Sequence, residues 1–295
     1  MDARGLFDGL VDLLFPRRCV VCRTPGAWLC DVCAAQLVEL PARRCPRCGA
    51  PAAADPGSAG GRVGPCAECG GRDLAFSRAA AAFVYEGPAR ALVTACKFRA
   101  FRSLAAEMAA LAAPAFAAAC GVTHDTGDAA GTQPSVRRTS AVPVDLVTWV
   151  PGHRERSLER GFNQAELLGR GLARFAGLPA APLLVRTRHG VRQSGLDRAA
   201  RAANVNDAFA LREDASRVLR TLKRVVIVDD VYTTGETLNH CARALEHTGT
   251  DLLAFTFART VRARRAHPSN NTPAPPHATP SCASLHTSTL KERCR

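Results

Sequence analysis

The sequence has few aromatic residues: two Trp, two Tyr and twelve Phe make up 5% of its 295 residues. Proteins commonly hold single-stranded nucleic acid by stacking bases on aromatic side chains, so few residues are available here for such a platform. Apolar runs are also short. No uninterrupted stretch reaches the ~18 residues typical of a membrane-spanning helix, and we expect no membrane span. Internal repeats are absent apart from recurring Cys-x-x-Cys pairs.

The N-terminus lacks the features of a secretory signal peptide. Its apolar stretch, within MDARGLFDGLVDLLFPRRC, contains acidic residues, and no cleavage site of small residues follows it. We interpret residues 1–18 as an amphipathic segment and expect a cytoplasmic protein. In a reducing compartment, clustered cysteines favour metal binding over disulfides.

Eight of the thirteen cysteines form four Cys-x-x-Cys pairs near the N-terminus. Each pair presents two thiolates to one metal ion, and two pairs complete a tetrahedral structural zinc site, so we predict two Zn²⁺ ions in a module spanning residues 19–72. One pair alone would fit a redox motif equally well, but four in close succession favour zinc. Consecutive pairs sharing one ion is the simplest arrangement, and an interleaved pairing is the alternative. The predicted ligands are Cys19, Cys22, Cys30, Cys33, Cys45, Cys48, Cys66 and Cys69.

Strand-like and helix-like patterns alternate along the rest of the chain. Apolar β-branched runs indicate strands, and a 3.6-residue periodicity indicates helices. Such alternation is typical of a parallel α/β sheet, so we predict an α/β domain over residues 79–262, with a parallel sheet flanked by helices. The predicted strands are 79–86, 144–150, 183–186, 223–229 and 251–259, and the predicted helices are 88–98, 103–119, 161–176 and 236–247.

Three further segments do not follow this alternation. Residues 121–143 are polar and rich in Gly and Pro, and we interpret them as a flexible insertion. Residues 187–205 are polar and basic without periodicity, which predicts a long loop, and long loops in compact domains are usually functional. Residues 263–295 are of low complexity and are predicted to form a disordered tail.

The net charge is +13, of which residues 261–295 contribute +5. Elsewhere the positive charge is concentrated in residues 151–201, which hold ten arginines and four acidic residues. A local arginine cluster suits the binding of phosphate or nucleic acid. The alternative is a solvated basic face that reflects an Arg-rich composition.

The stretch VVIVDDVYTTGET, residues 225–237, carries a clear chemical signal. Its strand places Asp229 and Asp230 at a carboxyl end, where parallel α/β sheets bind their ligands. The following TTGET opens a helix whose first amides, with the threonine hydroxyls, offer donors to an anion. A phosphorylated ribose satisfies both halves, because its diol suits the carboxylates and its phosphate suits the loop. The alternative is that the two aspartates only cap an ordinary turn.

This stretch resembles the 5-phosphoribosyl-1-pyrophosphate (PRPP) signature of type I phosphoribosyltransferases. RERSLERGFNQAELLGRGLA (154–173) and RQSGLDRAARAANVNDAF (192–209), together with the cysteine module, are similar to the ComF/GntX family. The resemblance covers roughly residues 15–260. It implies an N-terminal double zinc ribbon followed by a type I phosphoribosyltransferase-like domain.

The resemblance also implies roles for particular residues. Asp229 and Asp230 would hold the ribose 2- and 3-hydroxyls, and Thr233, Thr234, Gly235 and Thr237 would surround the 5-phosphate. Val231, Tyr232 and Glu236 complete the predicted PRPP-binding stretch. Mg²⁺ would accompany the pyrophosphate.

Four basic residues outside this stretch are further candidates. Arg154 and Arg156 follow a predicted strand and are placed to reach the pyrophosphate, although they also fit as surface arginines. Arg192 lies in the 187–205 loop, which matches the lid of the superfamily and would exclude water from the reaction. Lys97 resembles a recurring family lysine, and an extended surface lysine is the alternative.

Three functional hypotheses follow. The first is a phosphoribosyltransferase, a pentosyl-type glycosyltransferase that moves phosphoribose from PRPP to an unidentified acceptor. The second, which rests on the family's link to natural competence, is a PRPP-gated or non-catalytic factor that handles single-stranded DNA together with DNA-uptake proteins. The third is a scaffold that binds only protein, which would have no use for a carboxylate pair beside a donor-rich loop.

Overall fold

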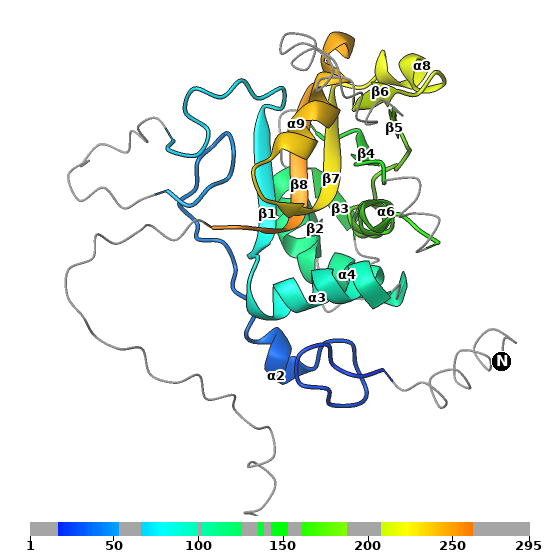
Figure 1. The fold of residues 1–295 in the computed structure, drawn as a ribbon. Helices are drawn as coiled ribbons and strands as arrows, with labels where there is room; N and C mark the ends of the chain where they lie inside the picture. The colour runs from blue at the N-terminus through cyan, green and yellow to red at the C-terminus, as the bar shows by residue number, and fades with distance from the viewer. Residues whose placement is uncertain are drawn as a thin grey trace, which may run out of the picture.

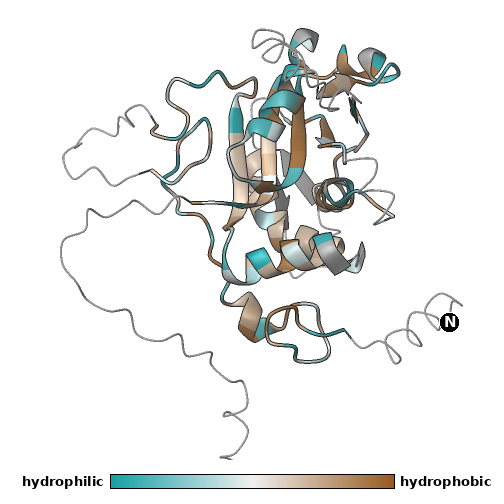
Figure 2. Cartoon of the chain, viewed as in Figure 1, coloured by the Kyte–Doolittle hydropathy of each residue, from teal (hydrophilic) through white to brown (hydrophobic). Residues whose placement is uncertain are grey.

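A parallel sheet with the strand order β1-β8-β7-β4 lies at the centre of the larger domain (Figure 1). The computed structural model describes residues 17–52, 66–99, 102–125, 135–138, 143–152, 161–187 and 208–261. The strands of this sheet are β1 (Arg78–Val84), β4 (Leu146–Trp149), β7 (Arg224–Tyr232) and β8 (Asp251–Arg259). All three neighbouring pairs are parallel, and the apolar run Val225–Val228 is buried in the centre. Figure 2 shows this concentration of apolar residues in the sheet.

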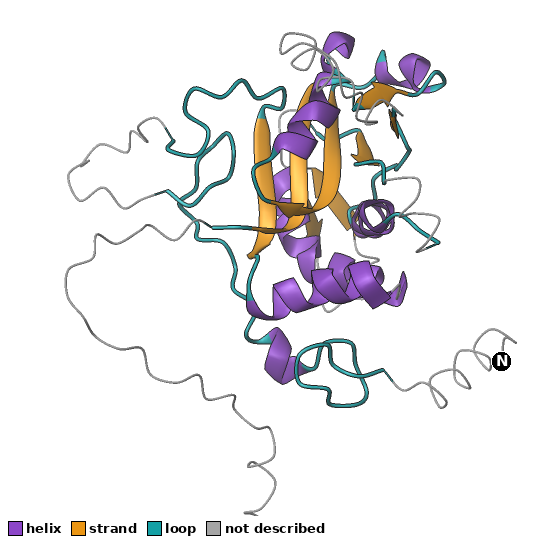
Figure 3. Ribbon diagram, viewed as in Figure 1, coloured by secondary structure: helices purple, strands orange, loops and turns teal. Residues whose placement is uncertain are grey.

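Helices cover both faces of the sheet (Figure 3). On one face, α4 (Arg102–Cys120) packs against α6 (Gln164–Phe175), and Gly169 of α6 lies against Trp149 and Val228. In front of the opposite face in Figure 1 lies α9 (Glu236–Arg243). Helix α3 (Gly87–Arg99) connects β1 to α4. Because parallel strands need such crossover connections, the alternation predicted from the sequence is confirmed.

By length and composition alone, Ser103–Cys120 of α4 is apolar enough to cross a membrane. Glu107 interrupts this stretch, so it contains no uninterrupted apolar run of ~18 residues. Leu104, Met108 and Phe116 are fully buried, and the Phe116 ring packs edge-on against Phe255 of β8. We therefore interpret α4 as a core helix whose apolar composition serves packing against the sheet.

The cysteine module lies along the outer edge of β1. Its short helix α2 (Asp31–Ala34) begins within the second cysteine pair, with Cys30 as its N-cap and Cys33 inside it. The amide of Val84 donates to the Val38 carbonyl at 2.8 Å, and the amide of Ala79 donates to the Arg47 carbonyl at 2.7 Å. The module thereby covers a sheet edge that would otherwise expose unpaired backbone groups.

Several elements differ from the sequence predictions. The prediction of a flexible insertion over 121–143 is wrong in part, because β2 (Val122–Asp125) and β3 (Ser135–Arg138) pair there as an antiparallel hairpin. The chain also contains β6 (Phe209–Leu211), which pairs with β5 (Leu184–Arg186), and a short helix α8 (Ala215–Leu219). These elements are too short for periodicity to reveal.

The ends of two predicted elements also move. β7 continues past Asp229 to Tyr232, because its pairing with β8 extends to Val231 and Tyr232. The predicted helix 236–247 ends at Arg243 and is followed by the 3₁₀ turn Glu246–Thr248. Asp229 and Asp230 therefore lie within the paired part of β7, close to its end, and share the rigidity of the sheet.

Candidate functional site

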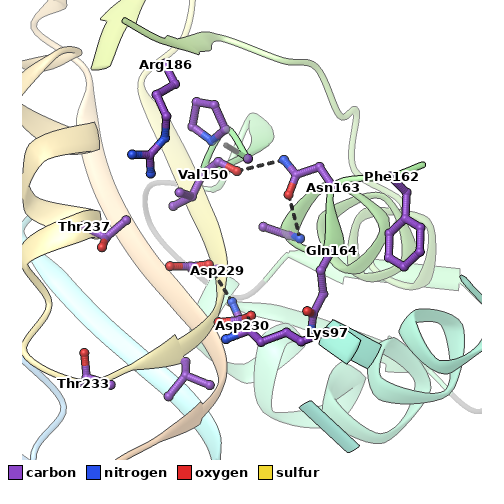
Figure 4. A pocket seen from close by; sticks show the side chains of 14 residues that line it. Lys97, Val150, Phe162, Asn163, Gln164, Arg186, Asp229, Asp230, Thr233 and Thr237 are labelled. Carbon is purple, nitrogen blue, oxygen red and sulfur yellow. Dashed lines mark hydrogen bonds and ion pairs between the residues drawn. The ribbon is translucent and has the colours of Figure 1, made fainter. Parts of the chain in front are cut away.

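A cavity of about 310 Å³ opens at the carboxyl ends of β4 and β7 (Figure 4). This volume is at the lower end of the range for small-molecule sites. Five parts of the chain meet there: the end of β7 with the loop and helix start that follow it, residues 150–152 after β4, the start of α6, the end of β5, and the last turns of α3. Six residues predicted from the sequence line it, namely Lys97, Asp229, Asp230, Val231, Thr233 and Thr237.

The two aspartates differ in their surroundings. Consecutive residues of a strand point to opposite faces, so the two carboxylates meet different neighbours although both line the cavity. Asp230 forms an ion pair with Lys97 of α3, with 2.8 Å between Nζ and Oδ2. Asp229 accepts a hydrogen bond from the backbone amide of Asp230 at 2.8 Å. The ion pair gives Lys97 a defined place in the cavity, which favours a site residue over an extended surface lysine.

Burial raises the pKa of Asp229 to about 7, and the negative charge of Asp230 adds to this effect. The Asp230 amide, Lys97 and Arg186 act in the opposite direction, because they stabilise the charged form. A carboxyl group in this state gains when hydroxyl donors or a cation reach it. The two aspartates therefore favour a ligand that supplies hydroxyl donors or a cation.

The loop between β7 and α9 depends on Gly235. Its φ is +79°, a conformation that favours glycine, and a Cβ atom there would lie 2.3 Å from the Tyr232 hydroxyl oxygen. The Thr234 hydroxyl accepts weakly from the Glu236 amide at 3.4 Å. Of the residues predicted to surround the 5-phosphate, Thr233 and Thr237 line the cavity, whereas Thr234 and Gly235 do not. Tyr232 and Glu236, from the rest of the predicted PRPP-binding stretch, do not line it either.

The start of α6 joins the site to the end of β4. Asn163 is the N-cap of α6: its side-chain oxygen accepts from the Ala165 amide at 3.1 Å, and its side-chain nitrogen donates to the Val150 carbonyl at 2.9 Å (Figure 4). This cap fixes where the helix begins. It also fixes how the next residue, Gln164, enters the cavity.

Two cavity residues were missed by the sequence predictions. Gln164 is 7% exposed, and neither atom of its side-chain amide has a hydrogen-bond partner in the part of the chain that the structure describes. Arg186, at the end of β5, lies over the Phe209 ring at 4.7 Å. The only available signal for Arg186 was its place at the end of a predicted strand. Gln164 falls at the start of the helix predicted over 161–176, where it fits either a cap or a support of the site.

The predictions for Arg154, Arg156 and Arg192 concern residues outside those that the structure describes. Their roles stay predictions. The same holds for the lid assigned to residues 187–205, of which only residue 187 is described.

The eight predicted zinc ligands form two groups, and the sulfur atoms of each group lie within 4.8 Å of one another. One group is Cys19, Cys22, Cys30 and Cys33, and the other is Cys45, Cys48, Cys66 and Cys69. The Sγ–Sγ distances are 3.5 Å for Cys22–Cys30 and 3.7 Å for both Cys45–Cys69 and Cys48–Cys66. A Zn–S bond of about 2.3 Å in a tetrahedron places sulfurs roughly 3.8 Å apart, so both groups fit Zn²⁺. The consecutive pairing is confirmed.

Comparisons with known proteins agree with the presence of a zinc ribbon near the N-terminus. A family model described as a double zinc ribbon domain matches residues 10–70. The DNA utilization protein YhgH of Salmonella typhi is 30% identical over 243 residues, which cover 80% of this chain and 94% of that protein. Competence protein F of Haemophilus influenzae is 37% identical over 103 residues, which cover 35% of this chain and 44% of that protein.

Among solved structures, the glutamine PRPP amidotransferase from B. subtilis, complexed with ADP and GMP, matches 39% of this chain and 22% of its own. The identity is 25% and the TM-score is 0.29. A second match, described as an allosteric regulatory enzyme of purine biosynthesis, has a TM-score of 0.26 and 24% identity, and covers 40% of this chain and 22% of its own.

The unpartnered amide of Gln164 leads to a stability prediction. An unsatisfied buried amide costs about 1–3 kcal/mol, so Gln164→Leu should leave the free energy of unfolding unchanged or raise it. The matched control is Asn239→Leu. Asn239 is 6% exposed, but its amide bonds Asp73 and Ala75, so its loss should destabilise the protein by roughly 1–3 kcal/mol. Denaturant unfolding of both variants checks this, and equal destabilisation by the two would contradict it.

The pKa of Asp229 leads to a second prediction. Because the carboxyl titrates near 7 in the folded chain and near 3.8 ordinarily, the folded state binds more protons between these values, and stability falls as the pH rises through them. Asp229→Asn removes this loss. The variant should therefore gain roughly 1–3 kcal/mol on the wild type between pH 5 and pH 8 in denaturant unfolding.

Asp214→Asn is the control for this measurement. Asp214 is exposed, and its hydrogen bond with Arg212 lowers its pKa, so the substitution should bring no gain at pH 8. A stability difference for Asp229→Asn that stays constant across this pH range would show that the carboxyl titrates normally.

Proposed function

The chain belongs to the ComF-like family, together with the DNA utilization protein YhgH and competence protein F, and on this premise we propose that it binds PRPP with Mg²⁺ and transfers phosphoribose to an acceptor. One observation carries the proposal. A carboxylate pair and the hydroxyls of Thr233 and Thr237 line a single cavity beside the start of a helix. Few ligands other than a ribose phosphate carry both hydroxyls for the carboxylates and a phosphate for the threonine side of the cavity.

The proposed binding mode assigns each half of the cavity to one part of the ligand. Asp229 and Asp230 accept hydrogen bonds from the ribose hydroxyls. Thr233 and Thr237 donate to the 5-phosphate, which also gains from the amides at the start of α9. Gly235 keeps the loop free of a side chain that would collide with Tyr232. The ion pair with Lys97 holds Asp230 in place for the diol.

The donor set also suits a magnesium–pyrophosphate group. Mg²⁺ prefers oxygen ligands and is usually held by one or two carboxylates together with substrate phosphates, and Asp229 is a buried carboxyl group that a cation would relieve. When bound, Mg²⁺ would neutralise charge on the pyrophosphate. Lys97 and Arg186 add positive charge from two other sides of the cavity. We propose that three further arginines also reach the pyrophosphate. Arg154 and Arg156 follow cavity residues 150–152 in the sequence, and Arg192 follows Arg186.

The proposed reaction replaces one bond at the anomeric carbon of the ribose. The bond from this carbon to the pyrophosphate oxygen breaks, and both electrons leave with the pyrophosphate. A nucleophilic acceptor forms the new bond and gives up a proton. The ring carbon is cation-like between these events, so the buried carboxylates would stabilise it and the exclusion of water would protect it. A reducing cytoplasm, where thiolates stay available for zinc, suits this proposal.

Calorimetric titration of the zinc-loaded protein with PRPP and Mg²⁺ tests the proposal. Asp230→Asn should weaken binding about tenfold or more, because a charged acceptor for the diol is lost. Asp214→Asn is the control and should bind like the wild type, because Asp214 is exposed and pairs with Arg212 instead of lining the cavity. No binding by the wild type, or unchanged binding by Asp230→Asn, would contradict the proposal. Pyrophosphate release with amines and nucleobases then identifies the acceptor.

Single-stranded DNA is the second candidate ligand. The names of the relatives refer to DNA utilization and competence, and the cysteine module carries exposed arginines at positions 18, 23, 43 and 44. Such side chains suit phosphate contacts without sequence preference. In this alternative, PRPP binding would gate DNA handling, or the site would be retained without catalysis.

Salt dependence distinguishes this second function. If the module contacts DNA phosphates, the affinity for a single-stranded oligonucleotide should fall steeply with salt. Replacing both Arg43 and Arg44 by Ala should then reduce the log–log slope by about 1.4, or ~0.7 for each lost phosphate contact. Arg170→Ala and Arg212→Ala, at exposed ion pairs outside the module, should leave the slope unchanged. Absence of binding at low salt would end this alternative.

A further inference from the structure

Arg72, which follows the second zinc group in the sequence, contacts the proposed phosphate loop, residues 233–237 between β7 and α9. This residue follows the last zinc ligand, Cys69, by three positions. One Nη donates to the Thr234 carbonyl at 2.6 Å, and the other forms an ion pair with Glu236. The two contacts lie on either side of Gly235, the residue on which the loop conformation depends. Arg72 therefore bridges both ends of the turn between β7 and α9.

The residues after Arg72 continue along α9. The Ala75 amide donates to the Asn239 side-chain oxygen at 2.7 Å, and the Asn239 side-chain nitrogen donates to the Asp73 carbonyl at 3.0 Å. Arg243 forms an ion pair with the Asp73 carboxylate at 2.8 Å. The segment that leaves the second zinc group thus lies against α9 from its first turn to its last.

A second connection passes through the last residue of β8. Arg259 is only 1% exposed, and its guanidinium lies 4.3 Å from the centre of the Tyr232 ring. It donates to Glu68 at 2.6 Å and to the Cys48 carbonyl. Glu68 stands between the ligands Cys66 and Cys69, so both partners of this buried cation belong to the Cys-x-x-Cys pairs of the second group. Tyr232 in turn contacts the position of Gly235.

Among the residues that the structure describes, no side-chain hydrogen bond or ion pair joins the four cysteines of the first zinc group to this loop. The backbone bonds of the first group run within the module, as from the Val20 amide to the Trp28 carbonyl and from the Gly26 amide to the Arg17 carbonyl. The chain therefore carries two chemically alike metal groups, of which only the second is linked to the loop by Arg72 in the part of the chain that the structure describes. This difference provides an internal control.

We propose that the second zinc group is a positioning element of the phosphoribose site, so that its metal occupancy and ligand binding at the loop are coupled. The inference rests on the proposed PRPP binding and adds a form of regulation to it. With the metal bound, the four thiolates hold both Cys-x-x-Cys pairs, and these hold Arg72, Glu68 and Arg259 against the loop. Without it, the pairs have no shared centre and the buried guanidinium loses fixed partners.

Coupling of this kind is reciprocal. If zinc at the second group strengthens PRPP binding, PRPP must retain zinc at that group by the same factor. A chelator would therefore remove zinc more slowly from the PRPP-bound protein. Two kinds of chemical agent can act on this coupling: chelators, which remove the metal ion, and oxidants, which attack its thiolate ligands.

Arg72→Ala in the full-length, zinc-loaded chain tests the coupling. The substitution removes no zinc ligand, so two zinc ions per chain should remain. PRPP affinity should fall about tenfold, and the slowing of zinc release by PRPP, followed with a colorimetric chelator, should disappear. Arg170→Ala, at an exposed ion pair on α6, is the matched control and should change neither. Unaltered PRPP affinity and unaltered zinc release in Arg72→Ala would overturn the inference.

Hydrogen exchange gives a readout that does not need PRPP. Amides of residues 233–237 should exchange faster in Arg72→Ala, and faster in Cys66→Ser, which disables the second group, than in Cys22→Ser, which disables the first. If the wild type does not bind PRPP but these amides respond as stated, the proposed function fails and the structural coupling stands. If PRPP binds and the amides respond equally to both cysteine variants, the coupling fails and the proposed function stands.

Discussion

The guanidinium of Arg259 is buried at the point where the zinc module, the sheet and the proposed phosphate loop meet. A buried cation is costly unless its charge and its donors are satisfied. Here the carboxylate of Glu68 and the carbonyl of Cys48 each accept from one Nη, and the guanidinium lies over the face of Tyr232, whereas Nε has no hydrogen-bond partner among the described residues. Glu68 and Cys48 both lie in Cys-x-x-Cys pairs. The metal group therefore does more than stabilise its own small domain. It holds the two groups, Glu68 and the Cys48 carbonyl, that accept hydrogen bonds from the buried guanidinium at the end of β8.

The carboxylates of β7 impose a second constraint on the same region. Continuation of the ladder to Tyr232 holds Asp229 and Asp230 on a rigid element, where neither can move away from the other by a change in loop conformation. Lys97 forms an ion pair with Asp230, whereas burial raises the pKa of Asp229 and the negative charge of Asp230 adds to this effect. A site of this kind stores unfavourable free energy that a ligand with hydroxyl donors or a cation can relieve. Gln164 adds an unpartnered amide to the same cavity, which also gains from a ligand.

Local patterns predicted the parts of the structure that depend on neighbours in sequence. The zinc ligands were predicted from cysteine pairs with two residues between the cysteines. The site around Asp229, Thr233 and Thr237 was predicted from one continuous stretch. The end of β7 was predicted three residues too early, because polar residues look unlike a strand whereas the pairing with β8 continues through them. Contacts between distant segments were not predictable. Arg72 meets Thr234 across 162 positions and Arg259 meets Glu68 across 191, and no periodicity or spacing records such a meeting.

The arrangement explains why a zinc module and the proposed phosphoribose site occur in one chain without a flexible linker between them. A module that only bound DNA could be joined by any tether, and its attachment would not need to contact the loop. Here residues 72–75 lie along α9, and the module also pairs with β1 at Ala79 and Val84. A binding event at the exposed arginines of the module would therefore act on the same rigid body that holds the loop. If the protein handles DNA as well as PRPP, the second zinc group is the physical route by which either ligand affects the other.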